Sequence, residues 1–288
     1  MKRHAGNSLR ISEASGLCRS AIRTTDIFGI ASLAGRALTA FLMVLIASVG
    51  HADAVTLAQM KKRGLMTVCA NPDSMPFADG LGSKPAGLQV DLARALGREL
   101  AVDVEFSWIE MRYQAAYVEC DAFMGVGILP NDDSPLKKTE PILWIEWLAV
   151  TKPGRSISKI EDMDHLRVAV QSGSMPHAAL LKRPVDISVA RTRDGEVLDA
   201  VTSGEVDVGF VTNIGLGWYL KRHPNAAFTQ AHGSIVNNGD GYFMGIGFRR
   251  SDSAMAEEAN RILDKLRKSG ELASIFANYG LSPAKMHP

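Results

Sequence analysis

Strand-like and helical stretches alternate along most of this chain, and this alternation limits the folds it can adopt. Residues 65–70 form an apolar run typical of a strand. Residues 87–100 follow with Leu88, Leu92, Leu96 and Leu100 at i+4 spacing, which predicts one apolar helix face. The same alternation returns from residue 166 onward. Two similar halves of alternating strands and helices predict an α/β fold with two lobes.

The expected elements define a specific division of the chain. Strands are expected at 65–70, 102–106, 122–126, 166–170, 186–190, 206–211, 226–230 and 243–248, and helices at 87–100, from Pro176 onward, 194–203, 215–222, 253–268 and 271–279. Residues 142–150 form a long apolar segment. We expect lobe 1 to comprise 65–150 plus 243–288. Lobe 2, residues 151–242, would be inserted between these parts. Two connecting strands would then form a hinge, with a ligand cleft between the lobes.

The first 54 residues differ from the rest. They hold six Lys or Arg and three acidic residues, and residues 37–49 are apolar and uncharged. A small-residue pattern follows and ends at Ala52 and Ala54. This arrangement predicts a secretory signal peptide cleaved near Ala52 or Ala54, and hence a periplasmic protein. The apolar run is shorter than the roughly 20 residues that span a bilayer, so we do not expect a membrane-embedded protein.

Charge and cysteine content exclude several classes of protein. The chain has 32 Lys and Arg against 31 Asp and Glu, a net charge of +1, which gives no support to a nucleic-acid binder. Of its three cysteines, export would remove Cys18 and leave Cys69 and Cys120. An even pair in an oxidising compartment favours one disulfide, and two buried free thiols are the alternative.

Six motifs, in order, carry a family resemblance over nearly all of the mature chain. They are Asn71-Pro-x-x-x-Pro-Phe77, the helix 87–100, Cys120-Asp-x-x-Met-Gly125, Gln171-x-Gly-Ser174, Gly204-x-Val-Asp-x-x-x-Val211 and Gly270-x-Leu-x-x-Ile-x-x-x-Tyr279. The chain resembles the periplasmic solute-binding proteins of the polar-amino-acid type, family 3. The resemblance implies a type II two-lobed clamp with hinge strands, which closes on a solute and presents it to an ABC permease.

The ligand-binding signature of that family is altered in this chain. The resemblance implies a carboxylate-binding Arg after the third strand, where this chain has Asp132, and an ammonium-binding Asp where it has Thr212. Ser74 replaces an aromatic residue, and Gly125 and Gly127 replace hydroxyl residues. Without both charged anchors, the ionic groups of an amino acid would be unpaired in the cleft, at a cost of several kcal/mol. We therefore do not expect an ordinary amino acid as ligand.

A narrower resemblance joins Val68-Cys-Ala-Asn-Pro72, Phe106-x-Trp108, Cys120-Asp-x-x-Met-Gly-Val126 and Asn278-Tyr-Gly-Leu281. These segments are similar to a branch associated with periplasmic PQQ-dependent (quinoprotein) alcohol dehydrogenases. The resemblance implies a Cys69–Cys120 bridge and a non-enzymatic accessory role for a dehydrogenase. The alternatives are a receptor that delivers a small polar solute to an ABC importer, and a periplasmic enzyme on the same clamp.

The candidate cleft residues are mostly polar groups near strand ends and at a helix start: Asp73, Phe77, Trp108, Gly127, Ser172, Gly173, Ser174, Thr212 and Asn213. Strand ends are the usual ligand positions in open α/β sheets, and a helix start favours an anion or a carbonyl. The plainer alternatives are a core role for Phe77, a helix cap at 172–174, a polar turn at 212–213 and a solvated charge at Asp73. No motif for a catalytic serine, a phosphate loop or a zinc helix occurs, so we expect neither cofactor nor metal.

Overall fold

The computed structural model describes residues 56–129, 133–191, 193–232, 241–249 and 251–281. The predicted signal peptide, its cleavage sites and Asp132 lie outside these residues. Within the described ranges, no helix has the length and apolar character needed to cross a membrane.

The elements come close to those expected from the sequence. The strands are β1 (Leu65–Ala70), β2 (Asp103–Trp108), β3 (Ala122–Ile128), β4 (Lys137–Lys138), β5 (Leu143–Thr151), β6 (Arg167–Gln171), β7 (Asp186–Arg191), β8 (Val208–Thr212), β9 (Thr229–His232) and β10 (Gly241–Phe248). The helices are α2 (Leu57–Arg63), α3 (Leu88–Leu100), α4 (Met175–Leu180), α5 (Asp194–Ser203), α6 (Asn213–Arg222), α7 (Ser253–Lys268) and α8 (Glu271–Asn278), with short 3₁₀ helices η1 (Arg112–Ala116) and η2 (Ile160–Met163).

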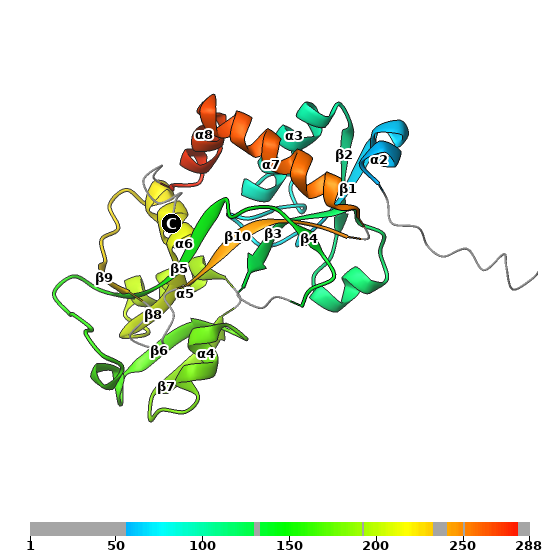
Figure 1. The fold of residues 1–288 in the computed structure, drawn as a ribbon. Coiled ribbons are helices and arrows are strands. Elements are labelled where there is room, and N and C mark those ends of the chain that lie inside the picture. The colour runs from blue at the N-terminus through cyan, green and yellow to red at the C-terminus, as the bar shows by residue number, and fades with distance from the viewer. Residues whose placement is uncertain (1–55, 130–132, 192, 233–240, 250, 282–288) are drawn as a thin grey trace, which may run out of the picture. The chain divides into compact units, whose positions relative to one another are not determined.

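The strands follow the order β2-β1-β3-β10-β5-β8-β6-β7, with β4 added beside β10 and β9 beside β5. β1 runs parallel to β2 and β3, whereas β10 runs antiparallel to β3 and β5. In the second part of the path, β6 runs parallel to both β7 and β8. The result is two groups of mainly parallel strands, each with its helices, joined through β5 (Figure 1).

Strand β5 belongs to both groups. Its residues 143–146 pair with β10, and residues 147–150 pair with β8. The segment is apolar almost throughout and is nearly all buried, as expected of a strand covered on both faces. One continuous strand therefore passes from the first set of strands to the second.

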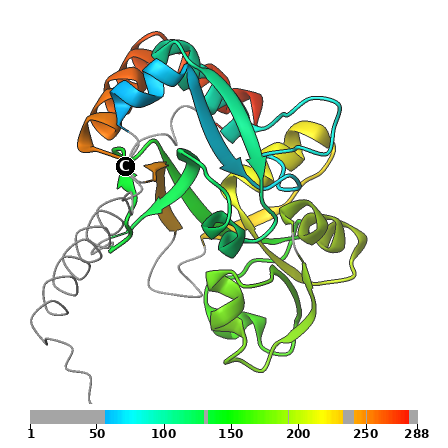
Figure 2. The same cartoon turned by 90° about the vertical axis from the view of Figure 1, so that its right-hand side faces the viewer.

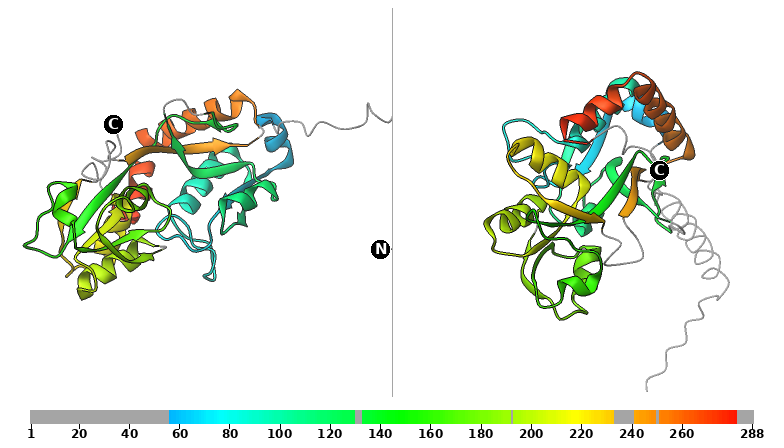
Figure 3. Two further views of the ribbon diagram at one scale, coloured as in Figure 1. Left: turned by 90° about the horizontal axis from the view of Figure 1, so that it is seen from below. Right: turned by 90° about the vertical axis from the view of Figure 1, so that its left-hand side faces the viewer.

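The helices of the first group share one core. Helix α3 contacts α7 and α8, and α7 also contacts β10 (Figures 2 and 3). The predicted leucine stripe of α3 is fully or almost fully buried in this core, so that prediction is confirmed. Tyr279, just after α8, donates a hydrogen bond of 2.7 Å to Asp91 on α3 and accepts one of 3.1 Å from the Gly87 N–H. These bonds connect the end of the described chain to the start of α3.

The second group has a core on each face of its strands. On one face, Leu148, Val150 and Ala169 pack with α5 and α6. On the other face, Val168, Val170, Val208 and Phe210 pack with residues around α4 and η2. This separation follows from the period-two alternation of side chains along a strand.

A disulfide joins Cys69, near the end of β1, to Cys120, just before β3. Both residues are buried. The bridge implied by the sequence is therefore confirmed, and it ties together two positions 51 residues apart in the chain.

Candidate functional site

The carboxyl ends of β6, β7 and β8 each lead into a helix. Gln171 ends β6 and is followed by Ser172–Ser174, while Thr212 ends β8. Strand β7 leads to Arg193 and Asp194 at the start of α5. Because these three strands are parallel, their carboxyl ends meet at one edge of the sheet, the usual location of ligand sites in α/β folds.

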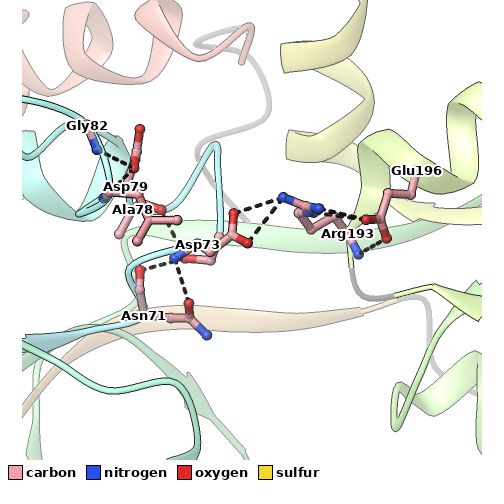
Figure 4. Close-up of polar contacts among 9 residues, drawn as sticks. Asn71, Asp73, Ala78, Asp79, Gly82, Arg193 and Glu196 are labelled. Atoms are coloured by element: carbon pink, nitrogen blue, oxygen red, sulfur yellow. Dashed lines mark hydrogen bonds and ion pairs between the residues drawn. The ribbon is translucent and has the colours of Figure 1, made fainter.

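Arg193 joins this edge to the loop that follows β1. Its Nη1 donates to the two carboxylate oxygens of Asp73 at 2.9 and 3.2 Å (Figure 4). The same guanidinium donates to Glu196 Oε1 from Nη2 at 2.8 Å and from Nε at 3.1 Å. These acids, with Glu196 contributing most, raise the pKa of Arg193. The carboxylate of Asp73 is therefore paired.

Asp194, the next residue, is buried beside Thr212. Its Oδ2 accepts hydrogen bonds from the Thr212 backbone N–H, at 3.2 Å, and from the Thr212 hydroxyl. The Thr212 hydroxyl oxygen in turn accepts from the Gly215 N–H at 3.0 Å, in the first turn of α6. Asp194 is 4% exposed, and its Oδ1 has no hydrogen-bond partner within the described residues.

The environment of Asp194 favours the protonated carboxyl. Burial raises its pKa from 3.8 to about 6, and the two hydrogen bonds from Thr212 act in the opposite direction. A carboxyl group with this pKa changes charge close to neutral pH. From the sequence alone, only the hydroxyl of Thr212 is expected at this place. In the structure, the carboxyl group of Asp194 lies beside that hydroxyl.

A pocket of about 330 Å³ lies between the loop after β1 and helices α5 and α6. It is lined by Met75, Pro76, Arg193, Asp194, Gly195, Glu196, Asp199, Gly215, Trp218, Tyr219, Arg222 and His223. Apolar surface thus comes from Met75, Pro76 and the two aromatic rings. Charged groups come from α5 and the end of α6, so the pocket suits a small molecule with both apolar and polar parts.

None of the nine candidate residues is among those that line this pocket, although Asp73 contacts its rim through Arg193. Thr212 and Asn213 are buried, and Thr212 is hydrogen-bonded to Asp194 in the pocket wall. The Asn213 side chain accepts from the Glu146 N–H at 3.2 Å and donates to the Trp144 carbonyl at 3.0 Å. Asn213 therefore completes the backbone hydrogen bonding of β5.

The turn 172–174 has local partners. Ser174 is the N-cap of α4 and accepts from the His177 N–H at 3.2 Å. The Gly173 N–H donates to His177 Nδ1 at 3.0 Å. Gly173 has a φ of +75°, which favours glycine at this position. Ser172 is exposed.

The remaining candidates make mainly packing contacts. Phe77 packs against the core of the first group. Trp108 stacks on Phe106 with 5.4 Å between ring centroids and lies against Gly80, where a Cβ would collide with the indole. The Gly127 carbonyl accepts a hydrogen bond of 2.7 Å from Lys138. A ligand role for these residues stays a prediction.

The sequence reasoning did not consider Arg193 and Asp194 as site residues. The signal was available, because the rule that selects Thr212 at the end of β8 applies equally to the end of β7. Their contacts with Asp73 and Thr212 could not be foreseen, since they join positions 120 and 18 residues apart. Among the described residues, no group of three or more His, Cys, Asp or Glu side chains could hold a metal ion.

Comparisons with known proteins identify the fold. No family model matches the chain. A protein of Escherichia coli K12 named "Putative ABC transporter arginine-binding protein 2" is 25% identical over 199 residues, which cover 66% of this chain and 79% of that protein.

Solved structures show the same similarity at the level of the fold. An ancestral cationic amino acid solute-binding protein has a TM-score of 0.63 at 22% identity and covers 78% of this chain and 99% of its own. A histidine-bound ABC uptake transporter substrate-binding protein from Streptococcus pneumoniae has a TM-score of 0.62 at 17% identity, with 77% and 94% covered. An L-arginine-bound protein from the same species has a TM-score of 0.61 at 18% identity, with 80% and 100% covered.

These similarities support the fold expected from the sequence but not the expected link to a quinoprotein dehydrogenase. Amino-acid-binding proteins of ABC transporters dominate the relatives named above, and none of them supports the quinoprotein dehydrogenase branch. One similar structure is described as a precursor of cyclohexadienyl dehydratase, so the fold alone does not separate binding from catalysis. The predicted architecture is confirmed: the chain has the two-lobed α/β fold of periplasmic amino-acid-binding proteins.

Proposed function

We propose that this chain is the solute-binding component of an ABC importer and captures a small polar solute of the amino-acid kind. The observation that carries the proposal is the shared strand β5, which joins two α/β groups beside a pocket lined from both of them. This arrangement allows two lobes to close on a solute by bending at a short connection. The names of the relative and of the similar structures support the same reading.

The chain has Asp132 and Thr212 where the family has the charged residues that bind an amino acid, but the pocket contains other charged groups. Asp194 provides a buried carboxyl group next to Thr212. Arg222 provides a cationic group at the pocket wall, whereas Arg193 is already paired with Asp73 and Glu196. A solute with both an ammonium and a carboxylate group therefore has charges of opposite sign within reach, although at positions different from those that the resemblance implied.

The proposal includes a cellular location and a division into lobes. Residues 1–54 would direct export and be cleaved near Ala52 or Ala54, so that the protein works in the periplasm with an ABC permease. Residues 65–150 with 243–288 would form lobe 1, and residues 151–242 would form lobe 2. An accessory role for a quinoprotein dehydrogenase has no support among the relatives, and we do not propose it.

Mass spectrometry of the protein recovered from the periplasm, after expression of the full chain, tests this function. We expect a native mass that exceeds the denatured mass by one small solute, which identifies that solute. The denatured mass also reports the cleavage site. A bare native mass, together with no heat of binding for any of the 20 common L-amino acids, would contradict the proposal.

A further inference from the structure

The two proposed lobes touch at two places beside the pocket, and these contacts differ in kind. The first, the rim pair, is the ion pair between Asp73, in the lobe 1 loop after β1, and Arg193, the residue just before α5 in lobe 2. The second, the α6–α8 seam, is the place where Gly217 on α6 of lobe 2 lies against Gly280, just after α8 of lobe 1. Arg193 and Trp218, the neighbour of Gly217, both line the pocket.

The α6–α8 seam is closely packed. A Cβ at Gly217 would lie 2.5 Å from the Gly280 carbonyl oxygen, and a Cβ at Gly280 would collide with the Gly217 backbone. Glycine at both positions is therefore what permits this approach. Lys221, on the same face of the contact, donates to the Asn278 carbonyl at 2.9 Å and to the Ala277 carbonyl at 3.2 Å. These bonds satisfy carbonyl groups at the carboxyl end of α8, which a helix leaves without partners of its own.

Helix α6 also enters the hydrophobic core of the first group of strands and helices. Ile214 is fully buried in that core. Trp218 packs against the same core, and its ring lies 5.7 Å from the Tyr279 ring. Separating α6 from lobe 1 would expose this apolar surface to water, which is unfavourable. The seam therefore resists opening.

The rim pair is easier to break. The side chains of Asp73 and Arg193 are 52% and 45% exposed, and Figure 4 shows that Arg193 extends toward Asp73 from beside Glu196. Exposed pairs are weak and are screened by salt. If the pair breaks, Arg193 keeps its bonds of 2.8 and 3.1 Å to Glu196 within lobe 2, and Asp73 is hydrated. Opening at the rim therefore leaves no buried charge without a partner.

We propose that Arg193 is a latch: the lobes part by breaking the Arg193–Asp73 pair, while the α6–α8 seam stays in contact and acts as the pivot. The proposal rests on the solute-binding function and the lobe division proposed above, and it adds how the pocket opens. Met75 and Pro76 line the pocket and follow Asp73 in the same loop of lobe 1. A solute therefore enters between this loop and the start of α5.

Distances between pairs of spin labels on the mature protein, freed of solute by dialysis, test this mechanism. The rim label pair is at Lys84, in the lobe 1 loop, and Lys182, after α4, which packs on the face of the lobe 2 strands opposite to α6. The seam label pair is at Ser274 on α8 and Asn225 after α6. All four positions are exposed and are replaced by Cys for labelling. The two native cysteines of the mature chain are joined to each other and do not react.

Breaking the latch should change only the rim distances. We expect Asp73→Asn to add a longer rim distance and to raise the ratio of open to closed molecules by up to about 5-fold, the value of one exposed ion pair. Salt at about 1 M should have the same effect on the wild type and little effect on the variant. The seam distances should stay unchanged. Asp207→Asn, which breaks the exposed pair with Arg167 inside lobe 2, is the matched control and should leave both sets of distances unchanged.

A glycine variant tests the pivot separately. Gly217→Ala places a Cβ against the Gly280 carbonyl and should lengthen the seam distances. Gly195→Ala is its control, because a Cβ there meets nothing within 4 Å, and it should leave the seam distances unchanged.

The outcomes separate this proposal from the solute-binding function. Rim distances in Asp73→Asn that equal those of the wild type at low salt overturn the latch. Seam distances that lengthen in Asp73→Asn, or that do not change in Gly217→Ala, overturn the pivot. None of these results depends on a solute, so solute binding is still decided by the native mass and the amino-acid titrations. If those fail while the label distances change as expected, the latch stands and the solute-binding function is overturned.

Discussion

Arg193, the residue just before α5, and Asp73, in the loop after β1, form an ion pair of 2.9 Å. The two residues are 120 positions apart in the chain, and both side chains are about half exposed. Arg193 also holds Glu196, so it would remain paired if Asp73 were changed. The contact therefore connects two distant parts of the sequence beside the pocket without burying a charge.

Replacing Asp73 by Asn should lower the free energy of unfolding by less than about 1 kcal/mol, because exposed ion pairs contribute little. The effect should shrink at high salt. Urea unfolding at low and high salt measures both effects. Asp207→Asn, which removes the exposed pair with Arg167, is the matched control. A loss above about 3 kcal/mol, unaffected by salt, would mean that the pair behaves as a buried one.

Removing the Cys69–Cys120 bond should destabilise the protein strongly. The bond closes a separation of 51 residues, and the loss of loop entropy in the unfolded chain is worth roughly 4 kcal/mol. We expect this loss in the double variant Cys69→Ser, Cys120→Ser, measured by urea unfolding. The reductant dithiothreitol should destabilise the wild type by a similar amount and leave the double variant unchanged. An effect of dithiothreitol on the double variant would contradict the assignment.

Asp194 should make stability fall as pH rises. An acid whose pKa is higher in the folded protein holds its proton more tightly there, so its stabilising effect is present at low pH. That effect is lost between about pH 4 and pH 6, since the pKa is raised from 3.8 to about 6. The Asn variant does not titrate. Its free energy of unfolding relative to wild type should therefore rise by up to about 3 kcal/mol from pH 4 to pH 7.

Asp207 supplies a control of opposite sign for that titration. The hydrogen bond from Arg167 lowers the pKa of Asp207, so its contribution is present at neutral pH and is lost as the pH falls. Relative to wild type, Asp207→Asn should lose stability as the pH rises. If the free energy of unfolding relative to wild type changed with pH in the same direction for both variants, at least one of the two titrations would be wrongly assigned.

Two helical glycines in the pocket wall should respond in opposite ways to substitution by alanine. A Cβ at Gly215 would overlap the Asp194 carboxylate, whereas a Cβ at Gly195 meets nothing within 4 Å. We expect Gly215→Ala to cost about 1–3 kcal/mol through crowding. Gly195→Ala should gain up to about 1 kcal/mol from the preference of helices for alanine. Thermal unfolding of both variants measures the difference, and equal melting temperatures would contradict the placement of Asp194.

The sequence was sufficient for elements that local periodicity defines. The strand at 65–70 and the helices at 194–203 and 253–268 have the bounds predicted for them. The leucines of α3 are buried as predicted because their i+4 spacing admits only one helical face toward the core. Helix α2 was missed, although Thr56 and Gln59 form a capping box at its start.

Local periodicity does not predict which strands or side chains pair when they are far apart in the sequence. Residues 142–150 stand out in the sequence as a long apolar segment, but nothing in them shows that the strand they form changes partners after Glu146. In the same way, an acidic first turn at 194 fits an ordinary helix start. Only the folded chain reveals that Asp194 turns inward to Thr212 and leaves one carboxyl oxygen without a partner among the residues that the structure describes.

The side chain of Asn213 occupies the place where β5 passes from one set of strands to the other. Its amide accepts from the Glu146 N–H and donates to the Trp144 carbonyl, and so it acts as a neighbouring backbone would in a sheet. Asn213 is also the first residue of α6, directly after the residue that holds Asp194. These two hydrogen bonds fix the start of α6 against the β5 backbone. One amide group thus connects the start of α6, which lines the pocket at Gly215, with the β5 backbone at residues 144–146.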